Sequence, residues 1–155
     1  KKLLVLIFAT LLLAQPLFSA GYGSSDTSSS GSRGNDKKVD PFANIHKLIN
    51  LEKFSEAHDA LKLLNVPTKQ ADKFNLLGFT ARKSGDLENA NGYYLKALEI
   101  NPKHVRALEY QGELFLQLGK VADAKLNLEK IQRICWLPCR AEKQLQEAIE
   151  LALKN

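Results

Sequence analysis

Apolar residues recur at helical spacing along most of the chain, and the clearest run lies between Ala71 and His104. Two apolar stripes in this run repeat every three to four residues, which is typical of two amphipathic helices. Gly85 stands between the stripes and Asn101-Pro102 follows the second, and both are signals that end helices. We therefore predict one helix–turn–helix unit over 71–104. Its pattern is carried by Phe74, Leu77, Gly78, Ala90, Tyr94 and Ala97.

Weaker copies of this pattern precede and follow the central unit. Ala57, Ala90 and Ala124 recur at intervals of 33 and 34 residues. Small residues repeated at such a period indicate helix pairs that stack in an array. We predict one further unit over 39–70 and another over 105–138. Their main apolar positions are Ile45, Leu48, Ile49, Phe54, Leu61 and Leu64 in the first unit, and Leu108, Phe115, Leu128 and Ile131 in the last.

Residues 139–155 carry one more amphipathic pattern. Pro138 separates it from the preceding unit, because proline is not accommodated inside a helix. Each helix pair of an array leaves one apolar face open, so the array needs an end cap. The sequence therefore predicts an all-α protein of about three helical hairpins with a C-terminal capping helix. The residues of that helix expected to face inward are Leu145, Ala148, Ile149 and Ala152.

Two glycines fall inside predicted helices. Gly78 and Gly112 each cost about 1 kcal/mol relative to Ala in a helix interior. This cost is easier to understand where a neighbouring helix backbone comes close, and Ala90 and Ala124 suggest such an approach from the opposite side. We expect both glycines to be structural.

The first twenty residues have the pattern of a secretory signal peptide. Two lysines precede the apolar run Leu3–Leu13, and small residues follow it. The run is shorter than the ~20 residues of a membrane-spanning helix. We expect residues 1–20 to be removed on export, which leaves no stable membrane span; an uncleaved signal anchor is the alternative. The predicted location is the periplasm or the cell exterior, and no Cys follows the run to accept a lipid anchor.

Residues 21–38 are rich in Ser and Gly and contain few apolar side chains. Such a segment buries too little surface to offset its chain entropy, so we predict a flexible linker. The net charge of +5 includes the two N-terminal lysines, and the remaining acidic and basic residues are interspersed along the chain. Nucleic-acid binding is not expected, because phosphate contacts require basic residues gathered on one face.

The repeated pattern resembles the tetratricopeptide repeat, a helix–turn–helix unit of about 34 residues. The central unit matches at Phe74, where the family often has Trp, and at Leu77, Gly78, Ala90, Tyr94, Ala97 and Pro102. The third unit matches at Gly112, Phe115 and Ala124, but has Gln111 and Trp136 where Leu and Pro are usual. The first is degenerate and keeps Phe54, Ala57 and Leu61. The resemblance covers residues 38–138 and implies a stacked hairpin fold.

The resemblance also implies a non-catalytic protein–protein interaction module, here an exported adaptor or assembly factor. In this family the concave face is lined by the first helix of each pair and holds a peptide or partner segment. The positions carried over to that face are Asp72, Asn75, Phe79, Arg82, Arg106, Glu109, Tyr110 and Glu113. Aromatic and Arg side chains carry much of the energy in such grooves. We expect charge reversal at Arg82 and Arg106 to weaken partner capture without unfolding the protein; the alternative for all eight is solvated helix surface.

One specific ligand of the family is not expected. Members that clamp a C-terminal carboxylate use a Lys/Asn/Arg set spread over three repeats. In this chain only Arg106 fits that set, and Leu76 and Tyr110 occupy positions that should be polar or basic.

Cys135 and Cys139 are the only cysteines of the chain. A structural disulfide is the preferred interpretation, because disulfides persist outside the cytosol. A redox-active pair is an alternative, although its spacing is one residue longer than Cys-x-x-Cys. Metal binding and free thiols are less favoured, since the three His residues are dispersed. We predict no metal and no cofactor.

No catalytic motif stands out in the sequence. A phosphate-binding Gly-rich loop, a nucleophile elbow and a paired His motif are all missing. Glu109 and Glu113 lie one helical turn apart, but such carboxylates on a helical array usually form a solvated or ligand-facing stripe. The prediction is a non-enzyme. Alternative functions are thiol–disulfide exchange at the cysteine pair and self-assembly through an open apolar face of the first unit.

Overall fold

The computed structural model describes residues 39–154, and every regular element in this range is a helix. The predicted all-α fold class is therefore confirmed. The expected signal peptide (1–20) and linker (21–38) lie outside the described residues. The elements are α1 (Ala43–Asn50), α2 (Phe54–Leu63), η1 (Pro67–Lys69), α3 (Gln70–Lys83), α4 (Leu87–Ile100), α5 (Val105–Gln117), α6 (Val121–Ile134) and α7 (Arg140–Ala152).

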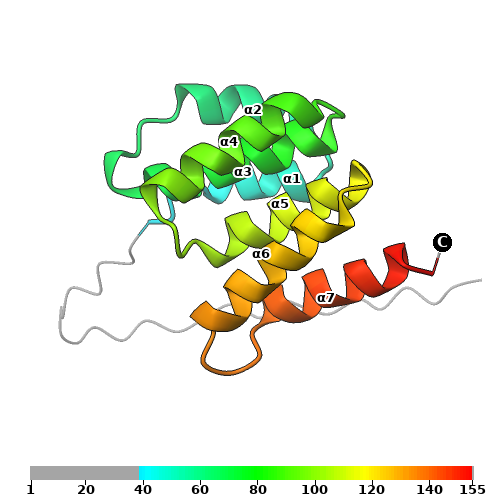
Figure 1. The fold of residues 1–155 in the computed structure, drawn as a ribbon. Coiled ribbons are helices and arrows are strands. Elements are labelled where there is room, and N and C mark those ends of the chain that lie inside the picture. Colours follow the sequence, from blue (N-terminus) through cyan, green and yellow to red (C-terminus); the bar gives the residue numbers. More distant parts are fainter. Residues whose placement is uncertain (1–38, 155) are drawn as a thin grey trace, which may run out of the picture. The chain divides into compact units, whose positions relative to one another are not determined.

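Consecutive helices pack as hairpins, with α1 against α2, α3 against α4 and α5 against α6, and α7 packs on both α5 and α6 (Figure 1). In the second and third hairpins the turn contains a glycine with a positive φ, Gly85 (87°) and Gly119 (72°). The equivalent turn of the first hairpin has Glu52 at a φ of 57°. An L-residue with a side chain adopts this region at a cost, so the degenerate first hairpin retains the turn geometry without the residue that favours it.

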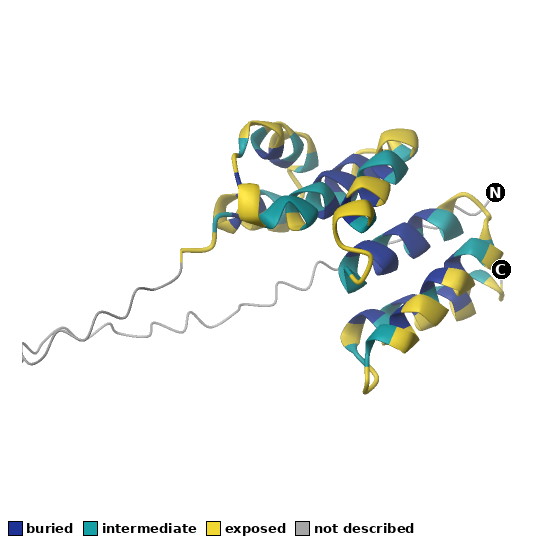
Figure 2. Cartoon of the chain, turned by 60° about the vertical axis from the view of Figure 1, so that its left-hand side comes forward, coloured by how far each residue is buried: buried dark blue, intermediate teal, exposed yellow. Residues whose placement is uncertain are grey.

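Buried side chains lie mainly on the helix faces turned toward neighbouring helices (Figure 2). Between the first two hairpins, the cluster of apolar residues includes Ala57, Leu61 and Leu77. Between α5, α6 and α7, a second cluster includes Leu108 and Leu145, both of which are essentially inaccessible to solvent. The stacking of hairpins predicted from the alanine period is thus held by apolar residues at every junction.

The two mid-helix glycines face side chains, which corrects the expectation that a helix backbone approaches them. A Cβ added at Gly78 would lie 2.6 Å from Cε1 of Tyr94 on α4. A Cβ added at Gly112 would lie 2.7 Å from the Cδ atoms of Leu145 on α7. An added Cβ would therefore meet the Tyr94 ring at Gly78 and the flexible end of the Leu145 side chain at Gly112.

The capping helix differs in part from its prediction. Leu145 and Ile149 face the core and are 0% and 4% exposed. Ala148 and Ala152 are partly exposed and line a groove that α7 shares with α5 and the end of α3. These two alanines were expected to face inward, and the structure places them at the edge of the buried face, where α7 meets solvent.

Candidate functional site

A groove of about 370 Å³ lies where the last turn of α3, the second half of α5 and the second half of α7 meet. The packing of Leu145 over Gly112 sets α7 against α5 and so creates the third wall. The lining is mixed, with apolar side chains along α5 and α7 and an ion pair between α3 and α5. The lining residues are Arg82, Glu113, Leu116, Gln117, Ala148, Leu151 and Ala152.

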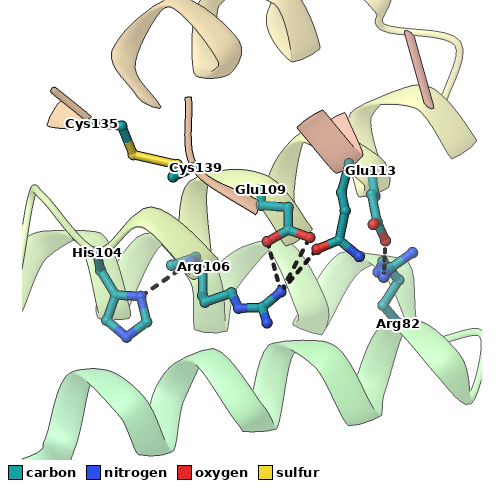
Figure 3. A network of polar contacts seen from close by, with 9 residues as sticks. Arg82, His104, Arg106, Glu109, Glu113, Cys135 and Cys139 are labelled. Carbon is teal, nitrogen blue, oxygen red and sulfur yellow. Dashed lines mark hydrogen bonds and ion pairs between the residues drawn. A yellow bond between two sulfur atoms is a disulfide. The ribbon is translucent and has the colours of Figure 1, made fainter. Parts of the chain in front are cut away.

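The ion pair joins Arg82 of α3 to Glu113 of α5 (Figure 3). The Arg82 side chain is only 6% exposed and that of Glu113 is 28% exposed. Glutamate introduced at Arg82 would place a second carboxylate beside Glu113 in this poorly solvated setting, which is strongly destabilising. This corrects the expectation that charge reversal at Arg82 leaves folding intact, because the arginine holds two helices together.

An aromatic pair continues the junction between α3 and α5. The ring centroids of Phe79 and Tyr110 are 4.9 Å apart, with a tilt of 43° between the planes. The guanidinium of Arg106 lies 5.6 Å from the centroid of the Tyr110 ring. Burial raises the pKa of Tyr110 above its ordinary value of 10.0. Both rings are half-buried, and their remaining exposed surface is the part that a partner could contact.

A second charged network lies on α5 beneath α7. Glu109 is completely buried, and Arg106 Nη1 donates to its Oε2 at 3.0 Å. The same nitrogen donates to Oε1 of Gln144 on α7 at 3.3 Å. Burial raises the pKa of Glu109, and the charge of Arg106 partly opposes this rise. Since Glu109 and Glu113 each bind a different arginine (Figure 3), they do not form a paired acid–base site.

The two remaining predicted residues lie near the start of α3. Asp72 is exposed, and its Oδ1 is 3.0 Å from Nε2 of His104. Nδ1 of His104 also accepts the backbone N–H of Ala107 at 3.1 Å, which caps α5. Asn75 is buried, and its Oδ1 has no hydrogen-bond partner among residues 39–154. Asp72 therefore contributes to the contact between the second and third repeats.

The structure brings the eight predicted residues together on α3 and α5, but most of them contact other side chains of the same chain. Asn75, Arg82 and Glu109 are buried, and only Asp72 is exposed. Their role in partner binding stays a prediction. Sequence reasoning missed five residues as groove lining: the apolar Leu116, Ala148, Leu151 and Ala152 and the polar Gln117. The available signal was their spacing: 113, 116 and 117 on α5 and 148, 151 and 152 on α7 each follow one helical face.

Cys135 and Cys139 form a disulfide that joins the end of α6 to the residue preceding α7. Both cysteines pack against the apolar cluster that contains Val105 and Leu145. The pairing agrees with the sequence prediction, and whether the bond is structural or redox-active stays open to measurement.

Among residues 39–154, no three His, Cys, Asp or Glu side chains are grouped so as to hold a metal ion. No helix between these limits has the length and apolar character needed to cross a bilayer.

The stacked hairpins and the groove beside their first helices define a helical-repeat protein of the interaction class. Residues 93–125 match the family model described as the tetratricopeptide repeat. A "TPR repeat-containing protein" of Borreliella burgdorferi is 30% identical over 122 residues, which are 77% of this chain and 53% of that protein. These two matches and the stacked helical hairpins support a tetratricopeptide-repeat protein. The chain spans about half the length of this curated relative.

The repeats indicate the function at a coarse level. Tetratricopeptide repeats are in general non-catalytic modules that bind other proteins. Binding of a protein or peptide partner by this chain stays a prediction.

Proposed function

We propose that this protein is an exported adaptor or assembly factor that holds a partner segment in the groove between α3, α5 and α7. The observation that carries the proposal is the groove itself, which lies beside the first helices of the repeats and is lined partly by apolar side chains. Leu116 and Ala148 supply apolar surface to bury, and Gln117 at the rim is exposed and can hydrogen-bond to a peptide. Such a surface suits a helix-in-groove or extended-peptide mode of recognition.

The charges of the groove favour a partner segment of low net charge. Arg82 and Glu113 neutralise each other at the floor, so neither sign of charge dominates there. A carboxylate would compete with Glu113 for a nearly buried arginine, and a cation would compete with Arg82. We therefore expect the partner to be an amphipathic segment with small or medium apolar anchors. We also expect it to reach the half-buried rings of Phe79 and Tyr110.

Site-specific photocrosslinking tests the groove. A benzophenone amino acid placed at Gln117, on the groove rim, is compared with the same probe at Lys125, which is exposed on α6. In cells of the native organism, irradiation should attach a defined protein at Gln117 and none at Lys125. Equal attachment at both sites, or attachment only at Lys125, would move the binding surface away from the groove.

A second variant sharpens this test. Substitution of Phe79 and Tyr110 together by Ala removes the aromatic pair between α3 and α5 and should reduce crosslinking at Gln117 severalfold. Circular dichroism of the double variant must match that of the parent, because both rings also pack between α3 and α5. Undiminished crosslinking in a folded double variant would restrict the partner to the α5–α7 side.

Export is proposed from the pattern of residues 1–20 and from the cysteine pair, since disulfides persist in oxidising compartments. Cell fractionation followed by intact-mass measurement tests it. The account predicts a periplasmic or secreted protein that lacks about the first twenty residues. A full-length chain recovered only with membranes would instead indicate an uncleaved anchor.

A further inference from the structure

The loop between α6 and α7 exposes two large apolar side chains. Trp136 is 95% exposed and Leu137 is 69% exposed. The loop forms an exposed tip beyond the ends of the two helices (Figure 2). Every other aromatic residue between 39 and 154 is buried or half-buried. An indole held in water is unfavourable, because a large apolar surface stays hydrated.

A disulfide spans this tip. Cys135 and Cys139 flank the three residues of the tip, and both pack against the apolar cluster of α5 and α6. The bond closes a loop with only three residues between the cysteines, which restricts the backbone on both sides of Trp136 and Leu137.

The charges around the tip are mainly positive. Lys130 and Arg133 on α6 and Arg140 on α7 flank it, and all three are exposed. One acidic residue further along α6, Glu129, forms an exposed ion pair with Arg133 at 3.1 Å. On α7, Glu142 is followed by Lys143. The end of the α6–α7 hairpin thus combines an aromatic tip with an excess of basic groups.

We propose that this tip, centred on Trp136 and Leu137, is a contact site for an anionic lipid bilayer. The indole and the Leu137 side chain would lie at the level of the headgroups, where tryptophan is favoured because one part of its ring is apolar and its N–H can bind water. The flanking Lys130, Arg133 and Arg140 would face the lipid phosphates. Such a contact is weak and reversible on its own and leaves the groove between α3, α5 and α7 open to a partner.

The size of the tip favours lipid over a protein surface. A stable protein interface buries about 800 Å² on each partner. A three-residue tip presents much less than this area. Attachment to a bilayer has no such requirement, because a few interfacial side chains and several basic groups act together on an extended anionic surface.

Intrinsic fluorescence tests the proposal directly, because Trp136 is the only tryptophan of the chain. The full chain is mixed with vesicles of phosphatidylglycerol or of phosphatidylcholine. The emission should shift to the blue on phosphatidylglycerol alone, and lipids brominated near the headgroup should quench it. Leu137→Ser should lower the apparent affinity at least about threefold, and Arg133→Gln with Arg140→Gln at least about tenfold.

A control variant and the emission shift of Trp136 together distinguish a contact at the tip from a contact elsewhere on the chain. Leu126→Ser changes a leucine on α6 that is 53% exposed and distant in sequence from the tip, so it should leave the emission shift unchanged. If the protein sediments with vesicles but its emission does not shift to the blue, the contact lies elsewhere, for example at the apolar residues 3–13. This result would overturn the proposal. An equal shift on phosphatidylcholine would also overturn it, as would a shift that only a protein partner produces.

Discussion

The second and third hairpins place a glycine at the same point of the repeat and fill the space above it in different ways. Over Gly78 lies Tyr94, which belongs to the same hairpin. The third hairpin has Leu128 at the position equivalent to Tyr94, and this smaller side chain does not occupy the space. Leu145 of α7 fills it instead. Over this glycine the second hairpin therefore packs its own side chain, whereas the third receives one from the helix that follows.

This difference gives α7 a definite structural role. It supplies a core residue that the third hairpin lacks, and its outer edge forms one wall of the groove. The disulfide between Cys135 and Cys139 joins the end of α6 to the residue preceding α7. Loss of α7 packing should therefore disturb the fold and the proposed binding site together.

The largest effect is expected for Leu145→Ala. Leu145 is completely buried, and its removal leaves a cavity over Gly112. We expect the free energy of unfolding to fall by about 3 kcal/mol, within the range for buried Leu→Ala changes. Urea denaturation followed by circular dichroism measures this. A loss below about 1 kcal/mol would mean that the third hairpin packs adequately without α7.

The two glycines should respond differently to alanine. A Cβ at Gly78 meets the Tyr94 ring, which is rigid and fully buried, so Gly78→Ala should destabilise by about 2 kcal/mol. A Cβ at Gly112 meets the flexible end of Leu145, and the better helix propensity of Ala offsets about 1 kcal/mol of the resulting destabilisation. The net change for Gly112→Ala should lie near zero. Equal losses in urea denaturation would remove the distinction between the hairpins.

The disulfide should contribute to the free energy of unfolding by an amount comparable to, or smaller than, the effect of Gly78→Ala. Replacing Cys135 and Cys139 by Ser opens a very short loop, and the chain-entropy estimate gives a loss of about 2 kcal/mol. Hydrogen exchange followed by mass spectrometry should show faster exchange in α7 and unchanged exchange in α3 and α4. Protection lost first in the second hairpin would contradict the local role assigned to the bond.

The smallest effect concerns pH. The position of Glu109 in the third hairpin is equivalent to Asn75 in the second, and both are buried. Burial raises the folded pKa of Glu109 above its ordinary value of 4.5, so the folded state holds the proton more tightly than the unfolded state. The stability from this group is present below pH 4.5 and is lost as pH rises through the folded pKa.

A variant isolates this pH effect. Relative to Glu109→Gln, the parent protein should lose stability between pH 4 and pH 7, as measured by urea midpoints at each pH. A parent that gains stability over this range would show that the ion pair with Arg106 outweighs burial. The neutral Asn75 predicts no such dependence for the second hairpin.

The sequence predicted those features that depend on local periodicity. The helix pairs followed from apolar spacing, and the stacking followed from the recurrence of Ala57, Ala90 and Ala124. The ion pair of Arg82 with Glu113 was not predicted, because it joins residues 31 positions apart whose burial depends on how two helices stack. A sequence does not distinguish residues that bind a partner from residues that join two stacked helices, since both sets place polar side chains on the same helix face.

The groove lay beyond sequence reasoning for a related reason. Leu116 and Ala148 become neighbours of one groove only through the angle at which α7 packs on α5. That angle is set by Leu145 over Gly112, and a pattern of apolar positions does not specify which side chain fills a given gap. The left-handed Glu52 was also missed, because the residue that usually indicates such a turn is absent from the first hairpin.

A double-mutant cycle between Gly112 and Leu145 tests most directly whether α7 completes the third hairpin. The account predicts that Gly112→Ala restores at least about 1 kcal/mol in the Leu145→Ala background, because the added Cβ enters the space that Leu145 leaves. Gly78→Ala combined with Leu145→Ala should be additive within about 0.5 kcal/mol. Additive effects of the Gly112 and Leu145 substitutions would show that the two sites do not interact and would contradict the account.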